Sequence, residues 1–485
     1  MISATKLAAQ FRSFLDADSV LIDGEQLRPY ECDGLSAFHE TPMIVVLPET
    51  VPQVQQILRL CNEHNVPVVA RGAGTGLSGG ALPLKNGVLL GLAKFNRILD
   101  IDTRNRSARV QPGVRNLEIS QAVKPFGLYY APDPSSQIAC TIGGNVAENS
   151  GGVHCLKYGL TVHNVRQVTI ATIDGELVTV GSNGLDAAGY DLLALIHGSE
   201  GMLGVIVDIT VQLLPIPQRA QVILAAFDSI AAAGAAVGAI IAAGIIPAGL
   251  ELMDQLAIRA AEDFAHAGYP VDAAAILLCE VDGTNEEVSD HIARVRDLLL
   301  EVGATDVRTA RDEDERARFW KGRKSAFPAV GRLAPDYYCM DGTIPRHRLP
   351  EVLSEISRLS GQYKLQVANV FHAGDGNLHP LILYDANKPG ELEQTEKLGG
   401  EILELCVKVG GTITGEHGVG VEKIGHMCVQ FNSSELQQFH AVKDAFDPKQ
   451  LLNPGKAVPT LHRCAEFGAM HVHGGKLPHP ELERF

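Results

Sequence analysis

Short apolar runs separated by glycine-rich turns fill the first half of the chain. Residues 51–64 form the main helical pattern there, because Pro48-Glu-Thr opens a segment with apolar positions at helical spacing. The apolar runs predict strands at residues 43–47, 66–70, 88–92, 98–101, 108–111, 165–171, 178–181 and 205–214. Many short strands with few helices indicate an α+β fold for this half.

The second half alternates strand and helix patterns more regularly. The expected order is strand 222–227, helix 230–243, strands 248–253 and 274–281, helix 286–302 and strand 306–310. This βαββαβ order is that of the ferredoxin-like split unit.

One uncharged stretch, residues 229–250, imitates a membrane span. It consists mostly of weakly apolar Ala and Gly, and Gly244 and Pro247 interrupt it. We therefore expect a soluble helix followed by a strand, and no transmembrane segment.

Two histidines bracket a glycine-rich turn in His372-Ala-Gly-Asp-Gly-Asn-Leu-His379. If residues 374–377 form the loop of a hairpin, His372 lies opposite His379. Opposed residues share a face of the sheet with Cβ atoms roughly 5 Å apart. The pattern therefore predicts two imidazoles that bind one metal ion.

A third ligand is expected from the later segment Gly415-Glu416-His417-Gly418. We assign Glu416 to the metal, which leaves His417 beside it as an extra histidine. Two imidazoles and a carboxylate suit Zn²⁺, Mn²⁺ or Fe²⁺ and leave coordination positions open. Asp375 and Asn377 are interpreted as turn formers.

Three clusters of glycine and small polar residues precede these motifs, at residues 71–80, 141–152 and 197–204. Glycine lets backbone N–H groups converge on an anion, and Arg71 adds positive charge. The first cluster is neither a P-loop nor a dinucleotide fingerprint, because it lacks Gly-Lys-Ser/Thr and no helix follows it. Together the clusters predict one extended ligand lying against the backbone.

The composition narrows the class of protein. A hydrophobic content of 46% and a charged content of 20% are typical of a folded soluble protein. The net charge of −16 argues against nucleic acid or an anionic membrane as the main partner. The nine cysteines include no CxxC pair, so neither a disulfide framework nor a cysteine-bound cluster is expected, and residues 1–19 lack the apolar core of a signal peptide.

The three glycine clusters resemble those of the FAD-binding domain of the vanillyl-alcohol-oxidase/p-cresol-methylhydroxylase superfamily. The histidine and Glu-His motifs resemble its D-2-hydroxyacid dehydrogenase branch, which includes the FAD-linked subunits of glycolate oxidases. The resemblance implies an α+β fold in which a two-part FAD-binding domain of the p-cresol-methylhydroxylase type carries a ferredoxin-like substrate (cap) domain. The expected parts are an N-terminal helical segment (1–38), the FAD-binding domain (39–218), the cap domain with the metal site (219–420), a C-terminal segment returning to the FAD domain (421–458) and a tail for partner contact (459–485).

The resemblance also assigns contacts with FAD. Some relatives attach FAD covalently through a histidine in the first loop; that position corresponds here to Thr75, so non-covalent FAD is expected. The pyrophosphate would lie on Arg71, Gly72, Gly74, Thr75, Gly76 and Ser78. The flavin and ribityl chain would contact Thr141, Gly143, Gly144, Asn145, Ser150, Gly151 and Gly152. The adenosine side would contact Glu200, Gly201, Gly204 and Ile206, and Asn453 would return to the flavin.

In the chemistry that the resemblance implies, the metal binds the hydroxyl and carboxylate of a 2-hydroxy acid and lowers the hydroxyl pKa. His417 takes the hydroxyl proton as the base, and the Cα hydrogen leaves as hydride to flavin N5. Arg323 pairs with the substrate carboxylate through a bidentate fork. Arg311, Arg316 and Arg318 are interpreted as a solvated helix face.

The same resemblance indicates the substrate and the partners. Relatives acting on 2-hydroxyglutarate carry a Thr and a Lys at positions that correspond here to Phe327 and Cys339, and neither can hold a second carboxylate. A small anionic acid, glycolate or D-lactate, is therefore expected. Electrons would pass to an external acceptor, through a second flavin subunit and an iron–sulfur electron-transfer subunit. The protein would be cytoplasmic, with peripheral attachment to the membrane face through these partners.

Three other functions are compatible with parts of the sequence. D-lactate dehydrogenase is the close alternative within the class. A non-catalytic flavin-binding or scaffold subunit is the alternative from another class, and the complete His-His-Glu-His set argues against it. A zinc hydrolase would leave the glycine clusters without a role.

Overall fold

The computed structural model describes residues 2–184 and 189–460 of the chain. Most of the tail expected to contact a partner, from residue 461 onward, lies outside the described residues. The chain forms two compact units. The first comprises residues 1–150, 160–215 and 417–485, and the second comprises residues 151–159 and 216–416.

A four-stranded sheet forms the first part of unit 1, in the order β1 (Val20–Leu21), β2 (Ile44–Val46), β4 (Val88–Gly91) and β3 (Val68–Arg71). Helix α3 (Val51–His64) has the predicted bounds; it begins at a capping box of Thr50 and Gln53 and ends where Asn65 turns left-handed. Helix α1 (Ala4–Phe11) packs into the same core, so the N-terminal helical segment belongs to this unit.

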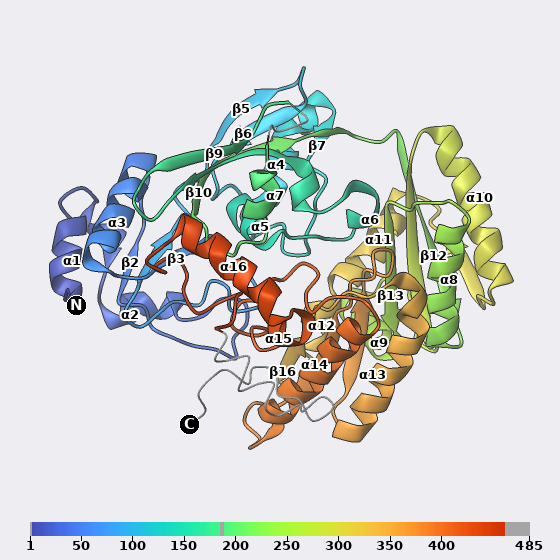
Figure 1. Ribbon diagram of the computed structural model, residues 1–485. Helices are drawn as coiled ribbons and strands as arrows, with labels where there is room; N and C mark the ends of the chain where they lie inside the picture. The colour runs from blue at the N-terminus through green and yellow to red at the C-terminus, as the bar shows by residue number, and fades with distance from the viewer. Residues whose placement is uncertain (1, 185–188, 461–485) are drawn as a thin grey trace. The chain divides into compact units, whose positions relative to one another are not determined.

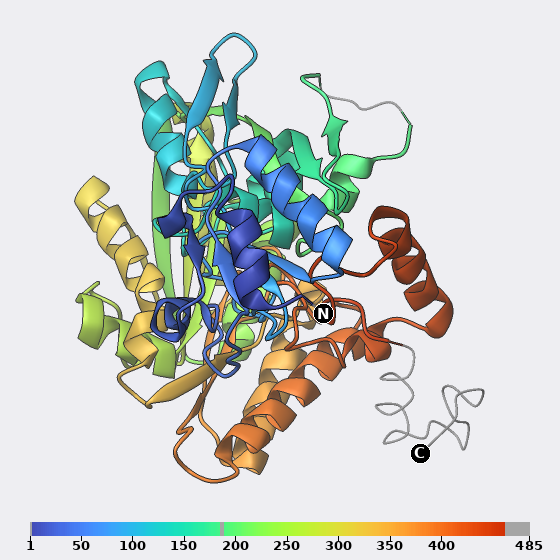
Figure 2. The same ribbon diagram turned by 90° about the vertical axis from the view of Figure 1, so that its left-hand side faces the viewer.

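A five-stranded antiparallel sheet forms the second part of unit 1. Its order is β5 (Ile98–Asp102), β6 (Ser107–Val110), β10 (Val205–Gln212), β8 (Val165–Ala171) and β9 (Leu177–Gly181). Figure 2 shows the β5–β6 hairpin at the upper edge of the view. The two sheets are the two parts expected of the FAD-binding domain.

Shorter elements complete unit 1. Strands β7 (Leu128–Tyr129) and β11 (Leu214–Pro215) pair with each other. The remaining helices are α2 (Gly24–Leu27), α4 (Asn116–Val123), α5 (Ile142–Glu148), α7 (Leu192–Ile196), α15 (Met427–Gln430) and α16 (Ser433–Phe446), with 3-10 turns η1 (Ala17–Ser19), η2 (Arg28–Tyr30), η3 (Lys124–Phe126) and η4 (Thr161–Asn164).

Unit 2 contains a seven-stranded antiparallel sheet. Its order is β15 (Asp306–Thr309), β12 (Arg219–Phe227), β14 (Ala275–Gly283), β13 (Gly249–Asp254), β17 (Val367–Phe371), β18 (Pro380–Tyr384) and β16 (Asp336–Cys339). The first four strands have the order of a ferredoxin-like unit, which confirms that prediction. The structure adds helix α9 (Gln255–Ala265), which follows β13 and precedes β14 in the chain. At its start, the Asp254 carboxylate accepts from the N–H of Ala257.

Helices cover both faces of this sheet. Figure 1 shows α8 (Ile230–Ala242) and α10 (Asn285–Glu301) beside β12. Helix α8 is followed by β13, as predicted for the uncharged stretch, and no helix within residues 2–184 and 189–460 has the length and apolarity needed to cross a membrane. The other helical segments are α11 (Glu313–Lys324), α12 (Ala326–Val330), α13 (Leu349–Tyr363), α14 (Glu391–Lys408) and the 3-10 turn η5 (Arg346–Arg348).

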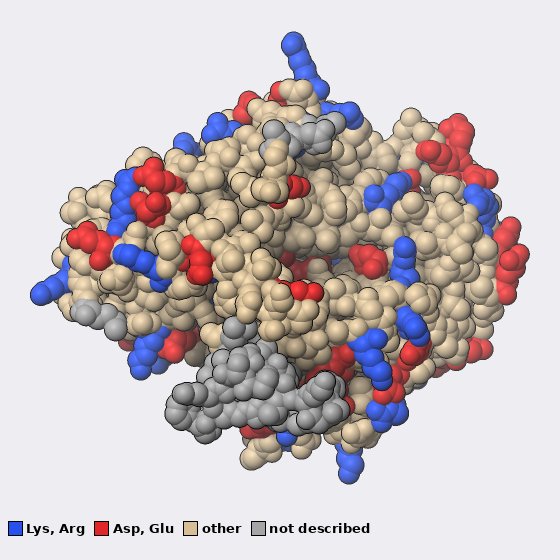
Figure 3. Space-filling model, in the orientation of Figure 1, with Lys and Arg blue, Asp and Glu red and all other residues tan. Residues whose placement is uncertain are grey.

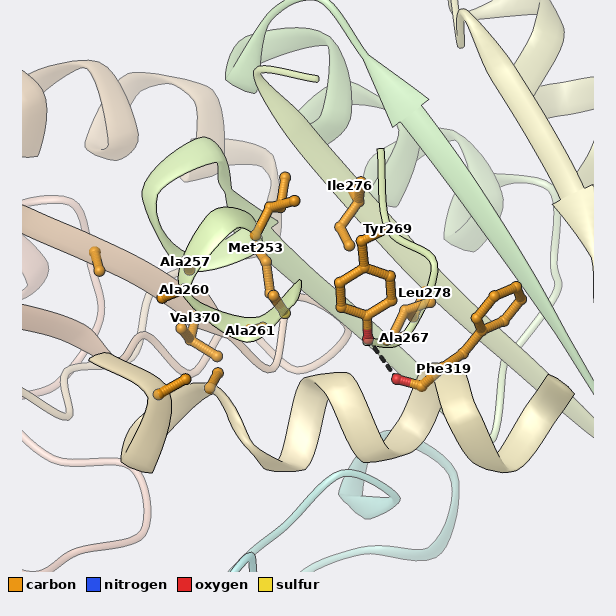
Figure 4. Packing of buried hydrophobic residues seen from close by; sticks show 14 of the residues in the cluster. Met253, Ala257, Ala260, Ala261, Ala267, Tyr269, Ile276, Leu278, Phe319 and Val370 are labelled. Atoms are coloured by element: carbon orange, nitrogen blue, oxygen red, sulfur yellow. Dashed lines mark hydrogen bonds between the residues drawn. The ribbon is translucent and has the colours of Figure 1, made fainter. Parts of the chain in front are cut away.

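The face under α9 and α11 carries the main core of unit 2. Figure 4 shows Met253, Ile276 and Leu278 of the sheet packed towards these helices. The hydroxyl of Tyr269 donates to the carbonyl of Phe319, and a Cβ added at Gly322 would overlap the Tyr269 hydroxyl. Helix α11 is therefore packed closely against the loop that joins α9 to β14 (Ala275–Gly283).

A short segment, Gly151–Gly159, belongs to unit 2 although the chain on both sides of it belongs to unit 1. It includes helix α6 (Cys155–Tyr158). Two buried acids of β14 hold it: Glu280 contacts His154 Nε2 at 3.2 Å, and Asp282 accepts from Lys157 Nζ at 2.5 Å and from the Tyr158 hydroxyl at 2.6 Å. The consecutive domain bounds expected from the sequence did not separate this segment from the residues on either side of it.

The exposed charges are mixed. Figure 3 shows Lys and Arg interspersed with Asp and Glu on the face drawn. Several arginines pair with an acid one helical turn away, such as Arg311 with Glu315 at 2.9 Å. Arg316 pairs with Glu313 in the same way but also reaches buried Glu280 at 2.8 Å, so it is more than a solvated side chain.

Candidate active site

The predicted histidine hairpin is present as strands β17 and β18, but its register differs from the prediction. Asn369 pairs with Pro380, and His372 pairs with Asn377 rather than with His379. The N–H of His372 donates to the Asn377 carbonyl at 3.1 Å, so the turn comprises residues 373–376 instead of 374–377. Because the shift is two residues and side chains alternate with a period of two, both histidines stay on one face as diagonal neighbours.

The three predicted metal ligands lie together within unit 2. The imidazole centroids of His372 and His379 are 5.0 Å apart. Their Nε2 atoms lie 3.5 Å and 3.0 Å from the same oxygen, Oε1 of Glu416. One ligand atom of each residue lies within 4.8 Å of the others, a spacing that one divalent ion can bridge.

The other ring nitrogen of each histidine has a protein partner. His372 Nδ1 lies 2.8 Å from Oε1 of Glu251, and His379 Nδ1 lies 3.4 Å from the carbonyl of Met340. Such contacts orient metal-binding imidazoles in proteins, because they keep Nε2 available to the ion. The donor set therefore fits a divalent metal.

The charges in this cluster reinforce one another. Burial disfavours the carboxylate of Glu416, but hydrogen bonds with His372 and His379 outweigh burial and hold the pKa of Glu416 well below its usual range. Burial also disfavours a charged His372, yet the negative charge of Glu251 holds the pKa of His372 well above its usual range. The pocket thus has the electrostatic balance of a site that holds positive charge.

Asp341 holds the loop that supplies Glu416. This carboxylate has no exposed surface, and it accepts from the Thr414 hydroxyl at 2.6 Å and from the Glu416 N–H at 3.2 Å. It also accepts from the side-chain amide of Asn377 at 2.9 Å. Asp375 forms the expected turn by accepting from the Asn377 N–H at 3.1 Å, whereas the buried Asn377 also ties the hairpin to the Glu416 loop.

Arg323 is buried rather than solvated. It lies near the end of α11 with 1% of its surface exposed, and its Nη2 lies 2.6 Å from Oε2 of Glu251. Its Nε is buried without a hydrogen-bond partner among the residues that the structure describes. A buried guanidinium with a spare donor is suited to bind an anion.

Two side chains that the sequence linked to substrate size flank His379. The Phe327 ring meets the His379 imidazole edge-on at 6.0 Å and the Tyr337 ring at 6.3 Å. Cys339, a buried residue at the end of β16, places its Sγ within 4.8 Å of a ligand nitrogen of His379. The residues on this side of the predicted metal ligand His379 are therefore uncharged.

The first two glycine clusters meet within unit 1. A Cβ added at Gly72 would overlap the hydroxyl of Thr141, and one added at Gly74 would overlap the Arg71 guanidinium. Arg71 donates to the carbonyl of Tyr30 at 3.1 Å. The buried hydroxyl of Ser78 has no hydrogen-bond partner among the described residues, which fits a loop that binds a phosphate group.

Thr141 begins helix α5, and its hydroxyl accepts from the Gly144 N–H at 3.4 Å. Asn145 is buried; its side chain donates to the Ser150 hydroxyl at 3.3 Å and accepts from Asn116 at 3.1 Å. These bonds fix the second cluster in place. Gly151 and Gly152, expected in the same flavin contact, belong to unit 2.

The third cluster is tied to the first by polar side chains. The Asn453 amide donates to the carbonyls of Gly80 at 2.9 Å and Glu200 at 2.6 Å. The Glu200 carboxylate accepts from the N–H groups of Val419 at 2.7 Å and Gly420 at 2.8 Å. The polar groups of both side chains are thus engaged within the protein, so any contact of theirs with FAD would come mainly from the backbone.

The remaining residues of the third cluster have close packing partners. A Cβ added at Gly204 would contact Ile170 at 2.7 Å, and Ile206 pairs with Ile170 across β10 and β8. Gly201 has a φ of +71°, in the left-handed region that favours glycine.

The chain passes from unit 2 to unit 1 between Glu416 and His417. Before this peptide bond, the Asp341 carboxylate accepts from the N–H of Glu416. After it, the Glu200 carboxylate accepts from the N–H groups of Val419 and Gly420. The backbone that carries His417 is therefore anchored on both sides.

Sequence reasoning missed two acids that hold this cluster, Glu251 and Asp341. Each is a single acid in an otherwise apolar strand or strand end, namely Gly249-Leu-Glu-Leu-Met and Tyr-Cys-Met-Asp341. Burying a carboxylate without a partner costs free energy, so an acid in an apolar strand pattern indicates that a partner lies nearby. That pattern was the feature of the sequence that could have identified both residues.

Comparisons with known proteins agree with this architecture. The chain matches the FAD binding domain over residues 42–181 and the C-terminal domain of FAD linked oxidases over residues 216–457. It is 67% identical over 484 residues to the glycolate oxidase subunit GlcD of Escherichia coli K12, covering 100% of this chain and 97% of that protein. It is 32% identical to a D-lactate dehydrogenase of Anaerostipes hadrus, covering 90% and 94%. The structure of p-cresol methylhydroxylase with bound substrate has the same fold, with a TM-score of 0.80 at 19% identity, covering 94% of this chain and 97% of that chain.

The two family matches and these relatives define an FAD-dependent oxidoreductase. The chain belongs to the family of FAD-linked oxidases.

Proposed function

We propose that this FAD-dependent hydroxyacid oxidoreductase oxidises glycolate to glyoxylate. The observation that carries the proposal is the set of buried His372 and His379 with partly buried Glu416, to which Arg323 is linked through Glu251. The 67% identical relative is named a glycolate oxidase subunit, which supports the choice of substrate. D-lactate is the second candidate, because a relative covering 90% of the chain is a D-lactate dehydrogenase.

The chain's own residues would bind and orient the substrate. Arg323 would pair with the carboxylate of the 2-hydroxy acid, using donors that Glu251 leaves available. His372, His379 and Glu416 would hold a divalent ion, which would supply Lewis acidity for the substrate hydroxyl. Phe327 and Cys339 would limit the substrate to a small side chain.

His417 would receive the hydroxyl proton. Its covalent neighbour Glu416 is a proposed metal ligand, so the His417 backbone is held near the place where the hydroxyl binds. FAD, when bound, supplies the acceptor for the hydride that leaves Cα. The hydroxyl proton and the Cα hydride together account for the two-electron oxidation of an alcohol to a carbonyl.

The FAD contacts proposed for unit 1 are those expected from the three glycine clusters. Their support is the meeting of Gly72 with Thr141 and the hydroxyl of Ser78, which lacks a partner among the described residues. The flavin would then be held without a covalent bond, because Thr75 offers no nucleophile comparable to histidine.

We further propose that reduced flavin passes electrons to partner subunits in the cytoplasm, with a second flavin subunit and an iron–sulfur subunit as the expected partners. The word "subunit" in the relative's name supports a complex. The sequence contains no CxxC pair that would ligate a cluster of its own, which is consistent with an external acceptor.

The deciding experiment is anaerobic mixing of the purified flavoprotein with single 2-hydroxy acids while flavin absorbance is recorded. Glycolate is expected to bleach the flavin fastest, with D-lactate next and L-lactate as the stereochemical control. Rapid bleaching by D-lactate with none by glycolate would assign the second candidate. A flavin that no 2-hydroxy acid reduces would refute the proposal and leave a non-catalytic flavin subunit.

A further inference from the structure

We propose that Glu251 is a positioning residue that locks the His372 imidazole and the Arg323 guanidinium into one rigid arrangement. The proposal rests on the function proposed above and adds a residue to it. Glu251 would fix both the orientation of a metal ligand and its spacing from the group that anchors the substrate carboxylate.

The sheet register places Glu251 beside the metal hairpin. Strands β13 and β17 are antiparallel, with Leu252 opposite Phe371 and Met253 opposite Val370. Extending this register by one residue puts Glu251 opposite His372, and the N–H of Gly374 continues the ladder by donating to the Leu250 carbonyl at 3.0 Å. The contact therefore follows from backbone pairing rather than from a chance side-chain conformation.

The carboxylate of Glu251 serves two partners at once. Its Oε1 lies 2.8 Å from His372 Nδ1, and its Oε2 lies 2.6 Å from Arg323 Nη2. Glu251 and Arg323 are each 1% exposed, and His372 is 3% exposed. Water therefore cannot replace either partner without rearrangement of the core.

A buried ionic triad is a poor way to gain stability. The cost of removing the charges from water is rarely exceeded by their attraction, and apolar residues of similar volume often stabilise such positions as well or better. The neighbouring positions of β13, Leu250 and Leu252, show that this strand accommodates leucine. The choice of Glu at 251 thus calls for a role other than stability.

Each contact has a distinct chemical consequence. Because the carboxylate can only accept, it keeps the proton of His372 on Nδ1 and directs the lone pair of Nε2 towards Glu416 and the metal. On the other side it uses Nη2 of Arg323 and leaves Nε without a partner among the described residues. One carboxylate thus sets the distance between the metal ligand and the anion anchor.

The chain offers a matched control. Glu280 is also a buried acid on this sheet, in the adjacent strand β14, and its partners are His154, Arg316 and Trp320. None of these partners belongs to the proposed metal site. The variant Glu280→Gln therefore reports what the loss of a buried acid does to folding alone.

The experiment compares wild type with Glu251→Gln, Glu251→Leu and Glu280→Gln. Zinc affinity is measured by competition with a chelating dye, FAD content by absorbance, and folding by the fluorescence of Trp320, the only tryptophan. Glu251→Leu should bind zinc roughly 10- to 100-fold more weakly while retaining FAD, the usual range for losing such a partner. Glu251→Gln keeps an acceptor for Nδ1–H, so its zinc affinity should fall less, whereas its KM for glycolate should rise more than its kcat falls because a neutral amide holds the Arg323 guanidinium in place less firmly than a carboxylate does.

The outcomes separate the two levels of inference. If wild type binds zinc and both Glu251 variants bind it as tightly as wild type, the role of Glu251 is refuted while the proposed function stands. If folded, FAD-loaded wild type binds no divalent ion, the proposed metal chemistry fails and takes this inference with it. Should Glu251→Leu not fold, the near-isosteric Glu251→Gln still decides, because an unchanged KM and zinc affinity there would overturn the proposal.

Discussion

The phenyl ring of Phe327 meets the imidazole of His379 edge-on, with ring centroids 6.0 Å apart. The Phe327 ring also contacts the Tyr337 ring, and the Cys339 Sγ lies within 4.8 Å of a ring nitrogen of His379. A proposed metal ligand is therefore bordered by an uncharged wall. A substrate that carried a second carboxylate to this wall would lose its hydration without gaining a partner.

From this wall we predict discrimination against dicarboxylates. The kcat/KM for D-2-hydroxyglutarate should be at least about a hundredfold below that for glycolate or D-lactate. Phe327→Lys should narrow this ratio, whereas Phe327→Leu, which keeps the wall apolar, should not. Equal turnover of the dicarboxylate by wild type would mean that another cation, such as Lys324, serves the pocket.

Removal of either histidine of the hairpin should remove the metal. His372→Ala and His379→Ala are each expected to lower the bound divalent ion from about one per chain to a small fraction, because a carboxylate and a single imidazole bind weakly. FAD should remain bound. Elemental analysis and flavin absorbance provide the measurements, with exposed His347→Ala as the control. Fully active wild type that contains no metal would contradict the prediction.

His417 should matter for rate but for neither cofactor. His417→Ala is expected to retain FAD and metal and to reduce flavin roughly 10²–10⁴ times more slowly, the usual effect of losing a general base. Stopped-flow reduction under anaerobic conditions measures this directly. Glu416→Ala serves as the contrasting variant, because it should lose the bound metal and also reduce flavin more slowly. If His417→Ala reduces flavin at the wild-type rate, the base lies elsewhere and Glu416 becomes the next candidate.

The flavin should be released intact when the protein is unfolded. Thr75 occupies the position at which relatives carry the attaching histidine, so mild denaturation followed by filtration should leave the yellow colour in the filtrate. Chromatography should identify it as FAD. Flavin that remains with the denatured chain would show a covalent bond at another residue.

Glu280 should make unit 2 sensitive to acid. Burial raises the pKa of this carboxyl, but His154, Arg316 and Trp320 outweigh burial and lower it to about 2 from the usual 4.5. Because the folded pKa is the lower one, the stabilisation is complete above pH 4.5 and is lost as pH falls towards 2. The difference corresponds to about 3 kcal/mol of unfolding free energy.

Urea unfolding followed by Trp320 fluorescence tests this at pH 7, 4.5 and 3.5. Trp320 donates to Glu280 at 2.5 Å, so its emission reports on unit 2 itself. The gap in stability between wild type and Glu280→Gln should be widest at pH 7 and narrow below pH 4.5. A gap that stays constant over this range would show that the carboxylate charge does not contribute.

The elements that the sequence predicted well are those with a local physical signal. Helix α3 has its capping box and the expected bounds, and the ferredoxin-like strand order followed from alternating apolar runs. The hairpin register was wrong by two residues, because the turn is fixed by contacts from outside it: Gly374 donates to Leu250, and Asn377 donates to Asp341. No pattern within the hairpin contains that information.

The candidate site shows the same division. His372, His379 and Glu416 could be named because glycine and histidine mark an unusual local motif, and the structure brings them together. Glu251 and Asp341 could not, since each acquires its meaning from a partner more than seventy positions away. Helix α9 was also missed, although its apolar residues recur at helical spacing and Asp254 stands at its N-cap, both of which were visible in the sequence.

The segment Gly151–Gly159 determines which fragments of the protein can contain a complete unit 2. A fragment spanning residues 216–416 would appear to contain the whole of unit 2, yet it would lack His154, one of the partners of Glu280, and both Lys157 and Tyr158, which donate to Asp282. Glu280 would keep its bonds with Arg316 and Trp320, whereas the buried carboxylate of Asp282 would lose both of these donors. Grafting this cap onto another flavoprotein therefore requires two separate transplanted pieces, and the smaller one is only a single turn of helix with its flanking loops.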